Sequence, residues 1–419
     1  MKKKVLGMVL SLTMVSSMMV GCTSAADQAA SSTDSSSTSE SSEAASSEDE
    51  ASESSSTASG NGIAVEDLKV GFVYVGDETD QGYTANFMQG TDELQEKLGL
   101  SDDQIIEKVN IPETSECETA LRELAEAGCN IIFATSFGFE DFVEEVAPDY
   151  PDIQFCHATG YQSANDDLDN THNYFPQIYE ARYLTGIIAG LKTQTNKIGY
   201  VAAFPYSEPM SGYTAFYLGA KSVNPDVEME VMYTNSWNDP TQEAQLAQAL
   251  IDDGCDVLGQ HADSTATATT CEKNGVWSIG YNSDMISRAP GASITSCRCD
   301  WGAYAIYACE ALLNGEEIAQ DWTGGLNEGA VIVCDYNEDL MPEGAADAVA
   351  EAEEKIKSGD LHVFDTSTFT VGGEEMTTYT NDNGVEFIED GYFHEQDPDY
   401  GGSSPAWPSD WVIDGITVK

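Results

Sequence analysis

Basic residues are scarce in this chain of 419 residues, which has 17 lysines and arginines, 73 aspartates and glutamates, and a formal net charge of −56. Binding to nucleic acid depends on Lys and Arg side chains that displace counterions from phosphates. The charge balance therefore excludes nucleic acid as a main partner. It also repels anionic lipid head groups, so any attachment to a membrane has to be covalent or by insertion.

Long apolar runs are equally rare, and the one that exists lies at the start. Three lysines precede an apolar stretch over residues 5–20, which is the layout of a secretory signal. A permanent membrane span needs roughly 20 apolar residues, so this stretch is too short for one. No other segment is apolar enough, which excludes a permease or channel.

The apolar stretch ends in Gly21-Cys22. A small residue directly before a Cys at this point resembles the lipobox of bacterial lipoproteins. The resemblance implies that Cys22 is acylated on its sulfur and becomes the mature N-terminus. The alternative is an ordinary secretory signal with a cysteine there by chance.

Large apolar residues are nearly absent from residues 23–62, which contain 16 serines and no Lys or Arg. Such a composition cannot bury enough surface to offset chain entropy, so it predicts a solvated tether. The chain therefore divides into a signal at 1–22, a tether at 23–62 and a folded domain at 63–419.

Cysteines are too few for a disulfide scaffold: ten in all, nine of them beyond Cys22. Several of these nine lie in or beside apolar runs, where Cys behaves as a small hydrophobic residue. Cys297-Arg298-Cys299 lacks the two-residue gap of metal and redox motifs. We expect thiols buried in the core and no metal site.

From Lys69 onward, short apolar runs alternate with segments of helical periodicity. One series runs from a strand at 69–76 to a helix at 178–191, and a second from a strand at 197–203 to a strand at 330–334. Such alternation predicts an α/β fold with two doubly wound parallel-sheet lobes. The segment from about 358 onward is predicted to be rich in β-structure, with a hairpin turn at Asn383-Gly384.

The residues that follow the predicted strands combine aromatic rings with carboxylates, amides or hydroxyls. Open parallel sheets bind ligands at the carboxyl ends of their strands, where flat rings can sandwich a flat ligand. None of these loops is rich in Lys or Arg. The pattern predicts an uncharged or cationic ligand, although any single ring could instead pack in the core.

Motifs for bond-breaking chemistry are missing. The chain has no G-x-G-x-x-G after a strand, no Walker lysine loop, no G-x-S-x-G and no H-E-x-x-H. Nothing in the sequence requires an enzyme or a cofactor.

A series of motifs in fixed order resembles the basic membrane protein (BMP) family, the substrate-binding lipoproteins related to the purine nucleoside receptor. The resemblance covers about 68–360, and the motifs are Asp80–Thr84, Ala134–Phe139, His157–Tyr161, Glu180–Gly186, Asn196–Pro205, Gln260–Ser264 and Gly280–Met285. It implies a type I periplasmic-binding-protein fold with three crossings between the lobes. It also implies a receptor that delivers a purine base or nucleoside to an ABC importer.

Within this resemblance, the residues that address ribose in nucleoside-binding members are replaced. Those members carry an Asn-Asp pair in the first loop, whereas Gly82-Tyr83 stands here. The position of a ribose-binding Asp is Asn282, and the region of a downstream Lys reads Arg298 to Trp301. The chain is similar to the branch associated with free purine bases such as adenine.

The sequence thus predicts a monomeric lipoprotein, anchored on the extracytoplasmic face, that binds a purine and docks on a membrane permease. Tyr83, Phe137 and Trp237 would stack on the base, Asp263 and Asp284 would accept its hydrogen bonds, and Trp301 would form the cleft wall. We expect lobes of roughly 68–175 plus 285–322 and 176–284 plus 330–419. Crossings are expected near Thr171–Gln177, Tyr281–Asp284 and Trp322–Gly329.

Three alternatives remain open at this point. The first is a receptor of the same fold for riboflavin, another flat heterocycle or a sugar. The second is a signalling receptor that feeds a membrane kinase. The third is an enzyme such as a nucleoside hydrolase, which would need a calcium-binding Asp cluster where the first loop offers only Asp77 and Asp80.

Overall fold

The structure is a computed structural model that describes residues 62–164 and 168–419. The predictions for the signal, for Cys22 and for most of the tether lie outside these residues. Within the described ranges, no helix is both long enough and apolar enough to cross a membrane.

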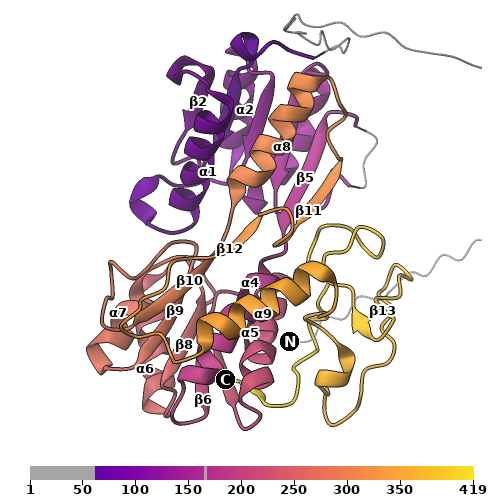
Figure 1. The fold of residues 1–419 in the computed structure, drawn as a ribbon. Coiled ribbons are helices and arrows are strands. Elements are labelled where there is room, and N and C mark those ends of the chain that lie inside the picture. Colours follow the sequence, from indigo (N-terminus) through magenta and orange to yellow (C-terminus); the bar gives the residue numbers. More distant parts are fainter. Residues whose placement is uncertain (1–61, 165–167) are drawn as a thin grey trace, which may run out of the picture. The chain divides into compact units, whose positions relative to one another are not determined.

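The first lobe is built on a parallel sheet of six strands in the order β11-β5-β4-β3-β1-β2. Its strands are β1 (Val70–Val73), β2 (Ile105–Lys108), β3 (Ile131–Ala134), β4 (Gln154–Ala158), β5 (Thr171–Pro176) and β11 (Asp321–Gly324). Its helices are α1 (Tyr83–Leu98), α2 (Ser115–Glu126), α3 (Glu140–Val146) and α8 (Trp301–Asn314). Although α8 comes late in the chain, it lies beside α1 (Figure 1).

Alternate residues of the first sheet point to opposite faces. Phe72 and Phe133 belong to the apolar cluster that includes Phe87 of α1. Val73 and Ile132, by contrast, pack with residues of α2 and α3 in a separate cluster. Helices therefore cover both faces, and the predicted doubly wound arrangement is confirmed for this lobe.

The second lobe has a sheet of seven strands in the order β12-β10-β9-β8-β6-β7-β15, with only the β10–β12 pair antiparallel. The strands are β6 (Lys197–Ala202), β7 (Glu228–Tyr233), β8 (Val257–His261), β9 (Trp277–Tyr281), β10 (Ser293–Cys299), β12 (Val331–Val333) and β15 (Ile416–Val418). Its helices are α4 (Ile178–Lys192), α5 (Ser207–Val223), α6 (Pro240–Asp252), α7 (Ala266–Asn274) and α9 (Ala345–Ser358).

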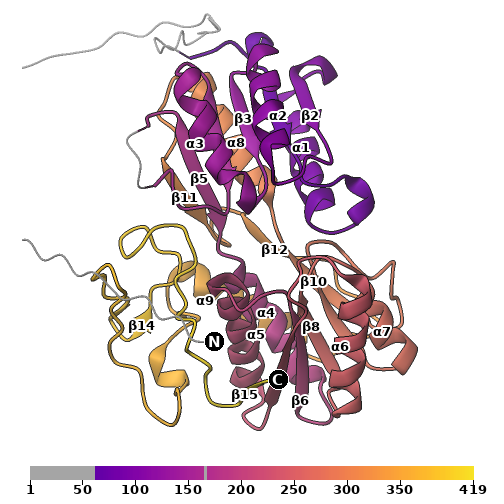
Figure 2. The ribbon, with the colours of Figure 1, turned by 180° about the vertical axis from the view of Figure 1, so that it is seen from behind.

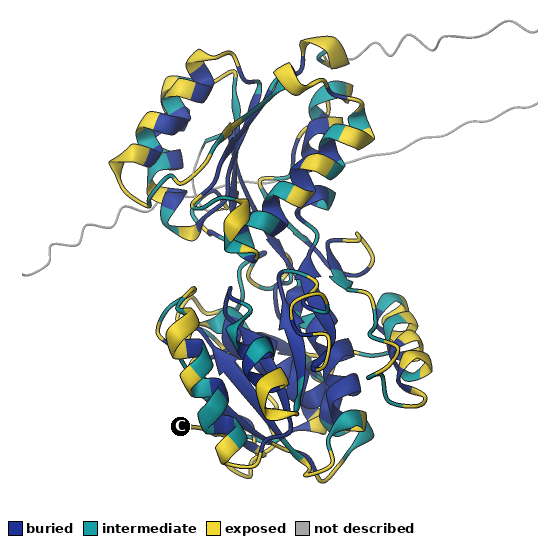
Figure 3. Ribbon diagram, turned by 90° about the vertical axis from the view of Figure 1, so that its left-hand side faces the viewer, coloured by how far each residue is buried: buried dark blue, intermediate teal, exposed yellow. Residues whose placement is uncertain are grey.

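Helices also cover both faces of the second sheet, with α4 and α5 on one face and α6 and α7 on the other (Figures 1 and 2). Colouring by burial shows dark blue strands between helices whose outer sides are exposed (Figure 3). Helices α4 and α5 pack with almost no space between their backbones. A Cβ atom added at Gly186 would overlap the carbonyl of Phe216, and one at Gly219 would overlap that of Tyr183.

The chain crosses between the lobes three times: at Pro176–Ile178, at Cys299–Trp301 and between Gly324 and Val331. The first and third crossings lie where the sequence indicates. The second crossing predicted at Tyr281–Asp284 is wrong, because β10 pairs in parallel with β9 and so keeps residues 293–299 in the second lobe. The chain consequently returns to the first lobe at Trp301 rather than at residue 285.

Three elements are absent from the sequence prediction: β5, β11 and α9. The prediction of a β-rich segment after residue 358 is also wrong, since most of that segment is irregular and β13 (Ile388–Glu389) and β14 (Tyr392–Phe393) are short. The predicted turn at Asn383-Gly384 is confirmed by the hydrogen bond from Gly384 N to Asn381 O and by the positive φ of Gly384.

We call residues 359–419 the C-terminal extension, drawn in yellow in Figures 1 and 2. Its Gln396 donates from Nε2 to the carbonyls of Phe175 and Pro176, at the first crossing, each at 3.3 Å. Its Ser403 contacts Asn173 of β5, and its last strand, β15, pairs with β7. The extension therefore contacts both lobes.

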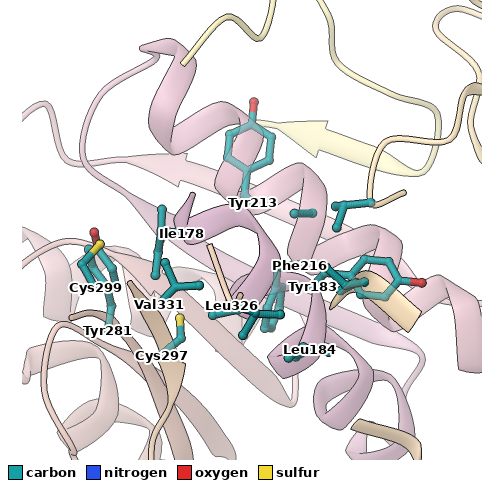
Figure 4. Close-up of a cluster of buried hydrophobic side chains, with 14 of the residues drawn as sticks. Ile178, Tyr183, Leu184, Tyr213, Phe216, Tyr281, Cys297, Cys299, Leu326 and Val331 are labelled. Carbon is teal, nitrogen blue, oxygen red and sulfur yellow. The ribbon is translucent and has the colours of Figure 1, made fainter. Parts of the chain in front are cut away.

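An apolar cluster includes residues of the crossings themselves (Figure 4). The labelled side chains come from α4, α5, β9, β10, β12 and the third crossing, and include Ile178, Phe216, Tyr281, Cys297 and Val331. Eight of the nine described cysteines are buried and none forms a disulfide within the described chain. Burial raises the pKa of Cys156 to about 12, so this thiol stays protonated. The prediction of core thiols is confirmed.

Candidate ligand-binding site

The two lobes meet where the strands end. Ser283, after β9, donates from Oγ to the carbonyl of Gln81, after β1, at 2.7 Å. A Cβ atom added at Gly82 would overlap the carbonyl oxygen of Asp263, after β8. The loop after β1 of the first lobe thus lies directly against the loops after β8 and β9 of the second.

The conformation of the first loop places Tyr83 at this contact. The Asp80 carboxylate accepts hydrogen bonds from the backbone N–H groups of Gly82, Thr84 and Ala85, at 2.9, 2.8 and 3.1 Å. These amides would otherwise lack partners at the start of α1, so the carboxylate caps the helix. Tyr83 becomes the first residue of α1 and lies at the lobe boundary.

Aromatic rings form one wall of the site. Trp301, the first residue of α8, is 4% exposed and stacks on Phe87 with ring centroids 4.0 Å apart. Tyr83 meets Phe87 and Trp301 edge to face, at 5.0 and 6.0 Å. Trp301 Nε1 has no partner among the described residues, so this wall also offers a hydrogen-bond donor.

In the second lobe, Asp263 and Asn282 form a buried pair, and Asp263 lies against Gly82 of the first lobe. Asn282 Nδ2 donates to Asp263 Oδ1 at 2.7 Å, and Asn282 adopts the left-handed conformation, with φ 65°. Burial is the main cause that raises the pKa of Asp263 well above its ordinary value, and the charges of Glu243, Asp80 and Glu208 add to it. The pair presents a carboxyl group that can stay protonated and, in Asn282 Oδ1, an acceptor without a partner in the described chain.

A second carboxylate lies near this pair. Glu208, the second residue of α5, approaches His261 with its Oε1 3.3 Å from Nε2. Burial, with the nearby charge of Arg182, lowers the pKa of His261, so the imidazole is neutral. Because a carboxylate only accepts hydrogen bonds, the imidazole proton belongs on Nε2. We call Tyr83, Glu208, His261, Asp263, Asn282 and Trp301 the interlobe cluster.

The structure thus brings together Tyr83, Asp263 and Trp301 of the residues predicted from sequence. Trp237 lies at the margin, 38% exposed, with its ring 6.2 Å from that of His261 and its carbonyl accepting the Asp263 N–H. Phe137 follows β3 and is 57% exposed. Asp284 is also exposed, and its carboxylate accepts the N–H of Ile286 at 2.9 Å, so it caps a turn instead of joining the cluster.

Sequence reasoning did not select Glu208 as a site residue. An acidic residue in the first turn of a helix is common because it interacts well with the helix dipole, so it gives no distinctive signal. The available hint is its position, two residues after the strand-end loop Phe204-Pro205-Tyr206.

Two parallel-sheet lobes joined by three crossings, with a polar and aromatic cluster where they meet, define the type I periplasmic-binding-protein fold. Residues 67–366 match the model of a family described as ABC transporter substrate-binding protein, PnrA-like. The chain belongs to this Bmp family. Its members bind solutes and do not transform them, so the chain is an extracytoplasmic receptor and not an enzyme.

Individual proteins agree with this assignment. A purine-binding protein of Brucella abortus (strain 2308) is 39% identical over 301 residues, covering 72% of this chain and 84% of its own. A Haloferax volcanii protein, named for glucose binding in ABC transport, is 34% identical over 324 residues, covering 77% of this chain and 81% of its own. A solute-binding protein of Conexibacter woesei shares the fold, with a TM-score of 0.61 and 19% identity over 70% of this chain and 98% of its own.

Proposed function

We propose that this protein captures a purine base, adenine ahead of its nucleoside, and delivers it to an ABC permease. The observation that carries the proposal is the buried Asp263–Asn282 pair, which lies against the loop that leads into Tyr83, itself in contact with Trp301. A planar base needs ring faces for stacking and carboxyl or amide groups for its N–H edge. The relative named as purine-binding, at 39% identity, supports the same ligand class.

The preference for a base over a nucleoside rests on the space and polarity near the first loop. Tyr83 occupies the position where a small polar pair would serve a ribose, and Asn282 replaces a carboxylate. Burying a sugar hydroxyl without a good partner costs about 1–3 kcal/mol. With two such hydroxyls, the nucleoside would bind considerably more weakly than the free base.

We further propose that the receptor is a monomer held on the outer face of the membrane through Cys22. The serine-rich stretch of residues 23–62 would give the folded domain enough length of chain to reach the permease from this anchor. The two exposed rings Phe137 and Trp237, which we call the rim rings, would close over the bound base.

The test is calorimetric titration of the protein after unfolding and refolding has removed any bound ligand. We expect adenine to bind at least about tenfold more tightly than adenosine, equivalent to about 1.4 kcal/mol. Equal or tighter binding of adenosine would contradict the preference for the base while leaving the transport role intact. Riboflavin belongs in the same series, because tight riboflavin binding without purine binding would replace the purine proposal.

A sugar is the second candidate, because the 34% identical relative is named for glucose binding. Aromatic rings with neighbouring carboxylates also suit the apolar face and hydroxyls of a sugar. Titration with glucose decides between a purine and a sugar as the ligand. For a purine receptor, we expect glucose to give no heat of binding at concentrations at which adenine saturates the protein.

A further inference from the structure

We propose that Glu208 is the residue that selects aminopurines over oxopurines. This inference rests on the proposed function and adds a contact that the sequence motifs did not indicate. Glu208 lies in the first turn of α5, at the end of that helix nearest the strand-end loop 204–206.

The geometry places this carboxylate within reach of a ligand. The Glu208 side chain is 21% exposed, whereas the side chain of the neighbouring His261 is almost fully buried. The centroid of the His261 ring lies 4.7 Å from that of Tyr281 and 6.2 Å from that of Trp237, so neighbouring rings restrict the imidazole. Its Nε2 lies 3.3 Å from Oε1 of Glu208, and this contact involves only one of the two carboxylate oxygens.

The electrostatics show that Glu208 is close to groups from both lobes. Its negative charge is among the causes that raise the pKa of Tyr83 of the first lobe and of Asp263 and Tyr281 of the second. Among the described residues, the ion-pair partner recorded for Glu208 is the neutral His261, and the charge of the buried Arg182 also acts on Glu208. A hydrogen-bond donor on the ligand would add a direct, charge-assisted contact to this carboxylate.

The two carboxyl groups of the site then have different roles. Burial raises the pKa of Asp263 and so favours a protonated carboxyl group, which can both donate and accept, whereas a carboxylate at Glu208 would only accept. An aminopurine offers an amine donor next to a ring nitrogen acceptor, which matches this pair. An oxopurine places a carbonyl oxygen where the amine would be, so two acceptors would face each other at Glu208.

The experiment compares adenine and hypoxanthine binding to the full chain by calorimetry, for the natural protein and for Glu208→Gln. The natural protein should prefer adenine by at least about tenfold, the size expected when a buried acceptor loses its donor. Glu208→Gln should reduce that preference to about threefold or less, because the Gln amide can donate to the carbonyl of hypoxanthine. Glu116→Gln is the matched control, since Glu116 is also the second residue of its helix, α2, but is exposed.

The outcomes separate this inference from the proposed function. If the natural protein binds adenine tightly and Glu208→Gln keeps the full preference, the inference is overturned and the purine receptor stands. If the natural protein binds neither base, both fail. If the Gln variant does not fold, Glu208→Asp is the variant to test. Its shorter side chain should weaken adenine binding more than hypoxanthine binding. An equal effect on the two bases would also overturn the inference.

Discussion

Asp263 is a carboxyl group whose burial links its protonation to folding. Burial, with the charges of Glu243, Asp80 and Glu208, raises its pKa in the folded protein, while in the unfolded chain it ionises at its ordinary pKa. The folded state therefore holds an extra proton between the two values. Its contribution to stability is greatest at low pH and falls as the pH rises through this interval.

Asp263→Asn removes this titration. We expect the melting temperature of the variant, relative to that of the natural protein, to rise as the pH rises above the ordinary pKa of an aspartate, as followed by circular dichroism. Asn keeps an oxygen that can accept from Asn282 Nδ2, so the local geometry should survive. Asp284→Asn is the control, because Asp284 is exposed and lies outside the interlobe cluster; an identical pH trend in both variants would contradict the prediction.

The rim rings allow a direct test of stacking. Truncating Trp237 or Phe137 to Ala should weaken adenine binding by about 1–3 kcal/mol, roughly 5- to 150-fold, through loss of a ring face. Both rings are partly exposed, so the fold should persist, which circular dichroism can verify. Trp237→Phe keeps a ring and should retain most of the affinity. A folded Ala variant with undiminished affinity would remove that residue from the site.

At the scale of residues, the sequence predicted positions along the edge of the sheet better than directions of side chains. The strand-end rule located Tyr83, Asp263 and Trp301, which the structure brings together. The same rule selected Asp284, but its carboxylate turns back to the N–H of Ile286. Which way a short polar side chain points depends on local backbone amides that a pattern of residue types does not reveal.

At the scale of elements, the strands and helices that were missed have weak apolar signals. Strand β5 begins Thr171-His172-Asn173, polar residues that are nevertheless buried, and Asn173 bonds Asp321 and Ser403. The full length of β10 was hidden by Arg298, whose charge suggests a loop but is paired with Glu93 of α1. Helix α9 is an exception, because Ala345, Val349, Ala352 and Ile356 are buried at regular helical spacing and the helix could have been predicted.

The loop after β1 provides a test of lobe contact. Gly82→Ala adds a methyl group that would overlap the carbonyl of Asp263, so the lobes can no longer meet there. We expect weaker adenine binding and a larger radius of gyration by small-angle scattering in the presence of adenine. Gly291→Ala is the control, because its methyl group would meet only the flexible carboxylate of Glu272, at 3.2 Å. An unchanged radius and affinity in Gly82→Ala would contradict this contact as a requirement for binding.

At the scale of the whole molecule, alternation of strands and helices was enough to predict two parallel-sheet lobes. The positions of the crossings were harder to predict, because a strand that pairs with its predecessor and a strand that changes lobe can have similar sequences. The second crossing shows this, since β10 stays with β9 and the chain leaves only after Cys299.

The proposed anchor predicts where the protein resides. Cys22→Ser removes the sulfur that would carry the lipid. After residue 22, the sequence contains no hydrophobic segment long enough to anchor the protein in its place. We expect the variant in the culture medium instead of the membrane fraction, with adenine affinity unchanged. Immunoblotting of fractions after a salt wash measures this, and a variant that remains with the membrane would contradict acylation at Cys22.

The C-terminal extension has a consequence for any attempt to shorten the protein. The family match ends at residue 366, yet β15 covers the outer edge of β7, and the fully buried Trp407 packs on Phe364 and Phe369. A chain stopped at 366 would leave Met229 and Val231 on a bare strand edge, and such edges recruit strands from other molecules. We expect size-exclusion chromatography to show soluble aggregates for this truncation and a monomer for the full chain. A monomeric truncation would mean that the family region folds unaided; otherwise the smallest independently folding unit of this receptor is larger than its family domain.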